Sequence, residues 1–183
     1  ALQGDLGISF VFGEPALQLI IQRMPATLEL AFASLFLSIV LGVPLGMYAG
    51  LKPDSKISKT MMAGSILGFS LPTFWVGIMM IMLFAVMLGW LPATGRGDTT
   101  ELFGVQVSFL TWDGLTHLAM PAVNLALTNI SLVMRLARAG CKEAALQDYV
   151  KFARAKGMSE QRIVLKHILK NIMIPVVTVL GLE

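Results

Sequence analysis

The sequence has little charge. Of its 183 residues, 14% are charged and 56% are hydrophobic, whereas a soluble domain usually carries about 25% charged residues. Residues 60–95 contain no charge, and Glu29 is the only charged residue between Arg23 and Lys52. Both stretches exceed the roughly 20 apolar residues that a membrane-spanning helix needs. The composition therefore weighs against a soluble protein and predicts an all-α polytopic membrane protein.

Several motifs of enzymes are also missing. The sequence has no G-x-x-x-x-G-K-S/T loop, no G-x-S-x-G and no H-E-x-x-H, which weighs against a Walker-type ATPase, a serine hydrolase and a zinc protease. Cys141 is the only cysteine, so no intrachain disulfide can form, and no second ligand or base accompanies it. His117 likewise lacks partners for a metal site. We predict no catalytic residue, no metal site and no cofactor bound by this chain.

The basic residues are unevenly distributed. Nine of the fourteen lysine and arginine residues lie between Arg135 and Lys170, with apolar segments on both sides. A basic cluster can bind nucleic acid, but between membrane spans the positive-inside rule is the simpler explanation and places the cluster in the cytoplasm. By the same rule the lysine-rich loop 51–60 is cytoplasmic. The loop 92–114 has one basic and three acidic residues and faces the outside.

The apolar segments predict four membrane spans. We expect these spans near residues 26–50, 60–91, 115–138 and 168–183. Residues 1–25 contain turn-forming glycines and too short an apolar run to cross a membrane, so we predict a periplasmic segment with an interfacial helix. The sequence does not begin with Met and ends within an apolar run, and we expect it to be part of a larger protein.

Three glycines mark a contact surface on the first span. Gly42, Gly46 and Gly50 recur at every fourth residue, so they lie on one face of a helix. Because they have no side chains, another helix can approach this face closely, a pattern common in membrane helices. The glycine stripe predicts helix packing and says little about chemistry.

Proline interrupts the second span. Pro72 removes a backbone hydrogen bond and disfavours helix at the residue before it, so we expect helical halves over about 57–69 and 72–89. We expect the two halves together to cross the membrane once. Farther on, residues 105–109 alternate between apolar and polar side chains, which predicts a short strand in the outer loop.

The long hydrophilic segment 148–157 lies between the third and fourth spans. Its favourable helix formers lead to Gly157, which can adopt the left-handed conformation that ends a helix. Ser159 can cap a second helix, with Glu160 in its first turn. We therefore predict two helices joined at a glycine corner, a shape suited to docking.

One face of the first of these helices suits a protein interface. Tyr149, Phe152, Ala153 and Lys156 are three or four residues apart, so we predict that they share a face. This face offers two aromatic rings, a small residue for close approach and a charge at the rim. On periodicity alone, an amphipathic helix folded onto the membrane or onto neighbouring helices is an equal alternative.

The same segment resembles the cytoplasmic loop of permease subunits of bacterial ATP-binding-cassette importers. Its form D-Y-V-x-x-A-R-A-K-G is similar to that of the dipeptide, oligopeptide and nickel branch. The resemblance extends over essentially the whole sequence, through five further matches in the family's order. They are GDLG at 4–7, RMPATL at 23–28, SLPTFWVG at 70–77, LGWLP at 88–92, and LKN at 169–171 with IPVVT at 174–178.

A literal Glu-Ala-Ala, the motif after which the superfamily's loop is often named, occurs at residues 143–145. In the family a glycine usually follows that glutamate by six residues, whereas Gly157 follows Glu143 by fourteen. Counting back from Gly157 places Lys151-Phe152-Ala153 at the motif positions, a departure common in the peptide branch. We therefore predict the coupling element at 148–157 and treat Glu143 as an ordinary helix residue.

The resemblance implies the transmembrane fold of a type I importer, here partial and carried by residues 26–183, with a coupling loop at 139–167. It implies that a coupling helix docks into a separate subunit that binds and hydrolyses ATP, so that this chain is not itself an enzyme. The matching docking residues are Asp148, Tyr149, Phe152, Ala153, Arg154, Ala155, Lys156 and Gly157. The implied partners are nucleotide-binding ATPase subunits, a second homologous permease subunit, a substrate-binding protein near residues 92–114, and lipid of the bacterial inner membrane.

We therefore expect a permease subunit of an ATP-driven importer for di- or oligopeptides or a related small solute, working by alternating access. Nickel complexes, glutathione and opine-like solutes are open alternatives. A competing class is a secondary transporter or channel, which would need intramembrane carboxylates for ion coupling, and only Glu29 qualifies. A membrane scaffold without a transport role is the third alternative, and it predicts no ATPase docking at 148–157.

Polar residues in the third span are candidates for a solute path. Asn124 and Thr128 share a helix face, and Asn129 follows them. The alternative for these residues is hydrogen bonding between helices, which contributes about 0.6 kcal/mol on average in membranes.

Overall fold

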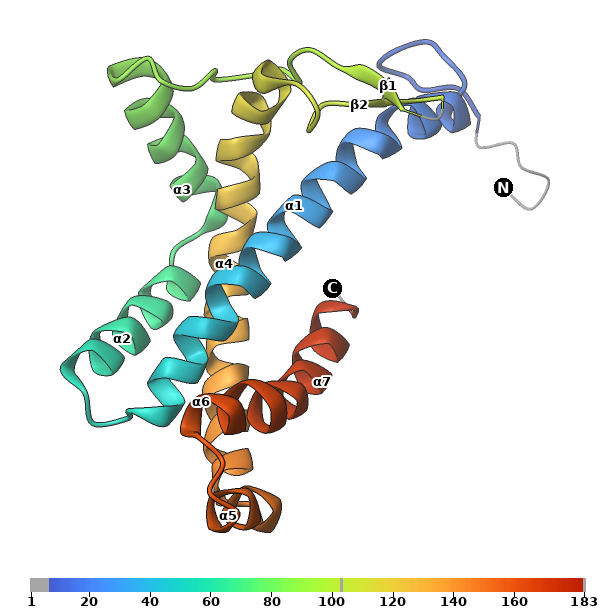
Figure 1. Cartoon of the computed structure of the whole chain (residues 1–183). Helices are drawn as coiled ribbons and strands as arrows, with labels where there is room; N and C mark the ends of the chain where they lie inside the picture. The colour runs from blue at the N-terminus through green and yellow to red at the C-terminus, as the bar shows by residue number, and fades with distance from the viewer. Residues whose placement is uncertain (1–6, 103, 183) are drawn as a thin grey trace. The chain divides into compact units, whose positions relative to one another are not determined.

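The computed structural model describes residues 7–102 and 104–182 and is mostly helical (Figure 1). Its α-helices are α1 (Ala16–Leu51), α2 (Lys56–Ser70), α3 (Thr73–Met80), α4 (Trp112–Leu146), α5 (Asp148–Ala155), α6 (Glu160–Ile163) and α7 (Leu169–Leu180). Two π-helices, η1 (Ile81–Met87) and η2 (Val164–Ile168), and two strands, β1 (Thr100–Leu102) and β2 (Val105–Val107), complete the described elements.

Among the described residues, three helical stretches are long and apolar enough to cross a membrane. They are Ala16–Leu51, Trp112–Leu146 and Glu160–Leu180. The segments Lys56–Ser70 and Thr73–Met87 pass the same test together, as a broken pair. The helical membrane fold predicted from the apolar segments is therefore confirmed, and the single crossing of the broken pair stays a prediction.

The chain forms two compact units. Unit 1 contains the chain up to Ala33 together with Met79–Ala122, and unit 2 contains Ser34–Ile78 and the chain from Val123 onwards. Helices α1, α3 and α4 each contribute residues to both units, and the contacts described below lie within one unit.

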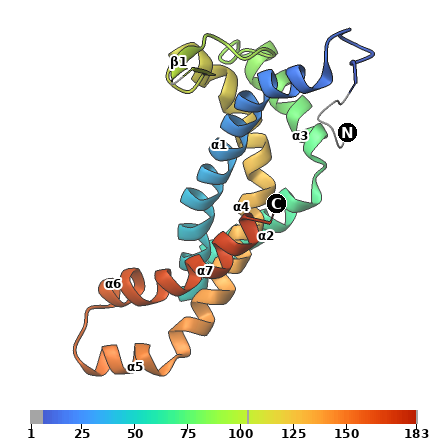
Figure 2. The ribbon, with the colours of Figure 1, turned by 90° about the vertical axis from the view of Figure 1, so that its right-hand side faces the viewer.

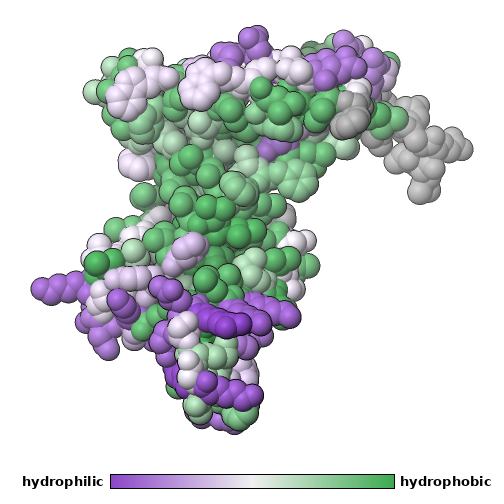
Figure 3. Space-filling view, viewed as in Figure 1, coloured by the Kyte–Doolittle hydropathy of each residue, from purple (hydrophilic) through white to green (hydrophobic). Residues whose placement is uncertain are grey.

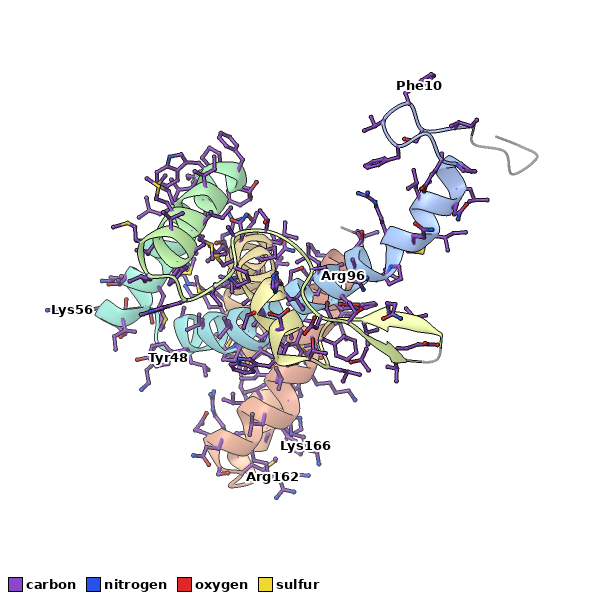
Figure 4. All side chains as sticks on the ribbon, turned by 90° about the horizontal axis from the view of Figure 1, so that it is seen from above. Phe10, Tyr48, Lys56, Arg96, Arg162 and Lys166 are labelled. Carbon is purple, nitrogen blue, oxygen red and sulfur yellow. The ribbon has the colours of Figure 1, made fainter. Side chains whose placement is uncertain are left out.

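In unit 1, a partly buried ion pair attaches the outer loop to α1. The Glu29 carboxylate accepts a hydrogen bond from Arg96 Nη2 at 2.8 Å and another from the Ser108 backbone N–H at 3.0 Å, and the Ser108 hydroxyl donates a third. Arg96, beside α1 in Figure 4, also donates to the Gln106 carbonyl at 2.6 Å. The loop carries the antiparallel hairpin β1–β2, so the predicted strand is confirmed over Val105–Val107.

In unit 2, the glycine stripe of α1 packs against α4, as predicted. A Cβ added to Gly46 would lie 2.4 Å from the Met134 carbonyl oxygen, and one added to Gly50 would lie 2.7 Å from Cys141 Cβ. Beside the stripe, the Ser38 hydroxyl lies 3.4 Å from the Ala126 carbonyl oxygen. The absence of side chains therefore brings the two helices into backbone contact.

Two helical stretches continue through positions where we predicted a boundary between separate helices. The interfacial helix predicted within residues 1–25 runs without interruption into the first span as α1, with Pro25 inside it. Proline removes one hydrogen-bond donor but has a φ compatible with helix, so the flanking turns maintain the helix. Likewise α6, η2 and α7 are contiguous from Glu160 to Leu180, although we predicted a separate fourth span from residue 168.

The predicted break in the second span is confirmed. Leu71 is extended, with φ −82° and ψ 134°, as expected for a residue before proline. The Pro72 carbonyl accepts the backbone N–H groups of Trp75 and Val76 and so starts α3. The conversion of this second half from α3 to η1 was not predicted, because a π-helix has no simple signal in hydrophobic periodicity.

Candidate functional site

The hydrophilic segment folds into a helical hairpin of α5 and α6 (Figures 1 and 2). Helix α5 ends in a Schellman motif, because the Gly157 N–H donates to the Arg154 carbonyl at 2.9 Å and the Met158 N–H donates to the Ala153 carbonyl at 3.2 Å. Gly157 has φ 78°, a conformation that costs other residues energy. The predicted helix and its glycine end are both confirmed.

The second helix begins at the predicted position, with Ser159 as the N-cap residue of α6 and Glu160 in the first turn. The Ser159 side chain makes no capping hydrogen bond to the described residues. Its backbone carbonyl instead accepts the Ile163 N–H at 3.1 Å, which is the first helical bond.

The face predicted for docking is divided between the surface and the core. Phe152 is 61% exposed, and the Lys156 ammonium lies 4.5 Å from the centre of its ring. Ala153 is 5% exposed and belongs with Val150 to the hydrophobic core. Ala153 is therefore buried within this chain rather than exposed beside Phe152, and its role in docking stays a prediction. Val150 and Ala153 are three residues apart and therefore share one helix face, which is buried. Phe152, next to Ala153 in the sequence, points in a different direction and is exposed.

Tyr149 is 38% exposed and also contacts α7. Its hydroxyl accepts a hydrogen bond from Asn171 Nδ2, and its ring lies 6.3 Å from the His167 ring, measured between centroids. Tyr149 and Asn171 also border a pocket of about 290 Å³, together with Glu143 of α4 and Gln147, the N-cap residue of α5. The hydrogen bond and the buried residues Val150 and Ala153 link α5 mechanically to the helices that follow it.

Exposed charges surround the hairpin. Arg154 forms a two-point ion pair with Glu160, with Nε and Nη2 at 2.7 and 3.1 Å from the two carboxylate oxygens. The hydrogen bond and the charge of Glu160 raise the pKa of Arg154. Lys151, 2.9 Å from Asp148, lowers the pKa of that carboxyl through a hydrogen bond and its charge.

These charges gather in one region of the surface. Figure 3 shows hydrophilic side chains over α5 and its turn to α6, next to hydrophobic side chains on the adjoining helices of unit 2. Arg162 and Lys166, on α6 and η2, project away from the ribbon in Figure 4. The hairpin is therefore a polar surface at the end of apolar helices, as an element outside a membrane would be.

The candidate path residues lie on α4. Asn124, Thr128 and Asn129 are all partly buried. The Asn124 amide nitrogen lies 3.1 Å from the position of a Cβ added to Gly77 of α3, and its carbonyl oxygen is buried without a hydrogen-bond partner among the described residues. Thr128 lies four residues after Asn124 and shares its helix face. Asn129, the next residue, points in a different direction.

Two further residues extend this face. Ser131 and Arg135 continue the spacing of Asn124 and Thr128 at steps of three and four. Ser131 Oγ lies 3.2 Å from a Cβ added to Gly68, and the Arg135 guanidinium lies 4.7 Å from the centre of the Phe69 ring. The spacing was visible in the sequence, but we assigned Arg135 to the cytoplasmic basic cluster.

Metal binding has little support from the described side chains. Within residues 7–102 and 104–182, no three His, Cys, Asp or Glu side chains are grouped closely enough to hold a metal ion. His117 is near Asp113, with its Nδ1 2.9 Å from the Asp113 carbonyl oxygen and 3.6 Å from a carboxylate oxygen. These contacts lie within one helical turn and orient the imidazole.

Sequence comparison gives consistent matches. The family described as "Binding-protein-dependent transport system inner membrane component" matches residues 42–183. The chain is 38% identical over 195 residues to the di/tripeptide transport system permease protein DppB of Pseudomonas aeruginosa, and 37% identical over 182 residues to the oligopeptide transport system permease protein AppB of Bacillus subtilis. These alignments cover 99% of this chain, 57% of the Pseudomonas protein and 56% of the Bacillus protein. The chain thus spans somewhat more than half the length of these relatives.

Proposed function

The chain belongs to the family of binding-protein-dependent transport system inner membrane components, and from this membership we propose that it forms the membrane-spanning part of a permease subunit for di- or oligopeptides. The family has the transmembrane fold of type I ABC importers, as the resemblance in the sequence implied. Two relatives are named for di/tripeptide and oligopeptide transport, which supports peptides as the solute class. Such permease components have no catalytic activity of their own, and ATP hydrolysis belongs to a separate subunit in this proposal.

The observation that carries the proposal is the geometry of α5. This helix lies outside the stretches that are apolar enough to cross a membrane and carries an exposed aromatic ring beside a lysine. Exposed aromatic side chains with charges at their rim are typical anchors of protein interfaces. We assign the contact with the ATPase subunit to the surface residues Asp148, Phe152, Ala155 and Lys156.

The remaining residues of the segment transmit force in this proposal. Tyr149 contacts Asn171 on α7, Ala153 packs in the core, and Arg154 holds α6 through Glu160. A movement imposed on α5 by nucleotide-driven closure of the ATPase subunits would therefore move α6 and α7 with it. Gly157 provides the conformation that the turn needs. Alternating access of the solute path follows from this coupled movement.

The secondary-transporter alternative is weaker. Its ion-coupling site would have to be Glu29, whose carboxylate is already occupied by Arg96 and Ser108. Proton or sodium coupling needs a carboxylate that can exchange its partners during transport. A carboxylate that attaches the outer loop to α1 suits a structural role. In our proposal this loop, residues 92–114, receives the substrate-binding protein, and a second homologous permease subunit and lipid complete the surroundings.

Cysteine crosslinking tests the docking of α5. Phe152→Cys and Ala155→Cys would be assembled with the candidate ATPase subunits in membranes, with and without ATP, and Glu143→Cys is the exposed control outside α5. We expect nucleotide-sensitive crosslinks from residues 152 and 155 and none from residue 143. The native Cys141 can stay, because its side chain is fully buried. Efficient maleimide labelling at residues 152 and 155 without any crosslink would contradict the proposal.

A further inference from the structure

One side of α4 carries a continuous row of polar side chains. Asn124, Thr128, Ser131 and Arg135 are separated by four, three and four residues, so they lie on one helix face. We refer to these four residues as the polar face. It lies against the broken helix pair, because Asn124 contacts α3 at Gly77, and Ser131 and Arg135 contact the last turns of α2.

The polar face contains a buried acceptor without a described hydrogen-bond partner and a charge without a described counterion. The Asn124 carbonyl oxygen is buried and accepts no hydrogen bond from the described residues. Arg135 donates from Nε to the Ser131 carbonyl at 3.2 Å, and none of the described carboxylates lies within 4 Å of its guanidinium. An unpaired buried acceptor and a charge without a counterion are both unfavourable inside a membrane. Both groups therefore suit a partner from outside the described chain.

Arg135 turns away from the loop that follows α1. Gly50 contacts Cys141, which places Cys141 level with the loop that follows α1. Arg135 precedes Cys141 by six residues, or about 9 Å along the helix. Its guanidinium lies on Phe69, at the end of α2 away from Lys56. An arginine that extends to headgroups would turn toward the loop instead.

We propose that the polar face of α4, opposite the break between α2 and α3, is the surface along which a peptide passes, and that Arg135 binds the peptide's terminal carboxylate. This inference rests on the proposed function. A peptide supplies what the polar face lacks, because its carboxylate can pair with the guanidinium at two points and its amide N–H groups can donate to Asn124. Thr128 and Ser131 provide further hydroxyl groups between these two positions.

The position beside a helix break supports this assignment. Irregular backbone at membrane depth persists where it is covered by protein or lines a polar cavity, since lipid cannot satisfy its hydrogen bonds. Discontinuous helices accompany solute sites in several transporter folds. At Gly68 and Gly77 the nearest groups of α4 are movable polar side chains, so these side chains can exchange a contact with α2 or α3 for one with a solute.

The test uses the complete transporter, with its ATPase subunits, partner permease and binding protein, in proteoliposomes. Uptake of tri-alanine and ATP hydrolysis stimulated by the binding protein would be measured for Arg135→Gln, Arg135→Lys and Asn124→Ala. Arg23→Gln is the matched control, because it removes an exposed arginine outside both the polar face and the α5–α6 hairpin. Each measurement would be repeated with and without anionic lipid.

We expect Arg135→Gln to reduce tri-alanine uptake by about tenfold or more, because a charge-assisted pair is lost, while ATP hydrolysis stays within about twofold of the wild type. Arg135→Lys should retain intermediate uptake, Asn124→Ala should show a smaller loss, and the control should behave as the wild type. Uptake by Arg135→Gln equal to the control would overturn the inference. A defect that appears only with anionic lipid would also overturn it, by assigning Arg135 to a lipid phosphate.

Two other outcomes have separate meanings. A wild-type transporter that does not import tri-alanine would contradict peptide transport itself, and with it the function on which this inference rests. Equal losses of uptake and of ATP hydrolysis in both Arg135 variants would identify a structural role for the arginine and overturn the assignment to the solute. The lysine variant separates these cases, because it keeps the charge in nearly the same place.

Discussion

Helix α4 makes two contacts in unit 2 that use glycine for different purposes. Toward α1, a Cβ added to Gly46 would meet the Met134 carbonyl oxygen at 2.4 Å, so backbone lies directly against backbone. Toward the broken pair, Cβ atoms added to Gly68 and Gly77 would meet side-chain atoms at 3.2 and 3.1 Å. The first contact has no room to adjust, whereas the second contains side chains that can rotate.

This difference separates a rigid contact from an adjustable one. Backbone atoms packed at van der Waals distance transmit displacement, because the surrounding structure cannot deform without cost. A serine or asparagine side chain can instead change rotamer. We conclude that the glycine stripe makes α1 and α4 move together in unit 2, while the polar face allows α2 and α3 to change their contact with α4.

The largest expected effect is at the rigid contact. Gly46→Ala should destabilise the protein by about 1–3 kcal/mol, because the new methyl group overlaps backbone that cannot move aside. The free energy of unfolding in detergent would measure this. Gly64→Ala is the control, because an added Cβ there meets no described atom within 4 Å, and it should stabilise α2 by about 0.5–1 kcal/mol. Equal effects of the two variants would contradict the assignment.

A smaller effect is expected at the adjustable contact. Gly77→Ala should cost less than about 1 kcal/mol in stability, since the Asn124 amide can rotate away from the new methyl group. Removing that amide in the double variant with Asn124→Ala should recover most of the loss, which a double-mutant cycle would measure. A cost as large as that of Gly46→Ala would show that this contact is equally rigid.

The hydroxyl beside the glycine stripe should contribute less again. Ser38 Oγ donates to the Ser34 carbonyl within α1 at 2.6 Å and lies 3.4 Å from the Ala126 carbonyl of α4. Ser38→Ala should therefore cost about 0.6 kcal/mol, the average for such bonds in membranes. Thermal unfolding compared with Ser70→Ala, an exposed serine bonded only within α2 among the described residues, would isolate the contribution of the contact between helices.

The smallest effect is expected at the exposed ion pair between Asp148 and Lys151, which lies outside both contacts of α4. Lys151 lowers the pKa of Asp148 below its ordinary value of 3.8, so this pair stabilises the fold above that pH and ceases to do so as the pH falls through the lowered pKa. Because Asp148 is fully exposed, solvent screens the pair. Asp148→Asn should unfold at the same temperature as the wild type from pH 5 to 8. A clear loss of stability at pH 7 would show that α5 depends on this exposed pair.

Several features of the candidate site followed from nearby residues in the sequence. The break after Leu71, the end of α5 at Gly157 and the glycine stripe of α1 all have the predicted positions. Proline before a helix, glycine after one and small residues at every fourth position each act on the backbone beside them. Such local preferences do not depend on where the rest of the chain lies.

Other features depended on the tertiary structure. The sequence placed Ala153 beside Phe152 on one docking face. In the structure, Ala153 packs with Val150 in the hydrophobic core, whereas Phe152 is exposed. The sequence grouped Arg135 with the cytoplasmic basic cluster, and only the structure shows that its guanidinium lies on Phe69 of α2. Sequence spacing therefore established which residues share a helix face, and contacts with distant helices established which face is buried. The physical reason is that burial is a property of two surfaces, and a single segment contains only one of them.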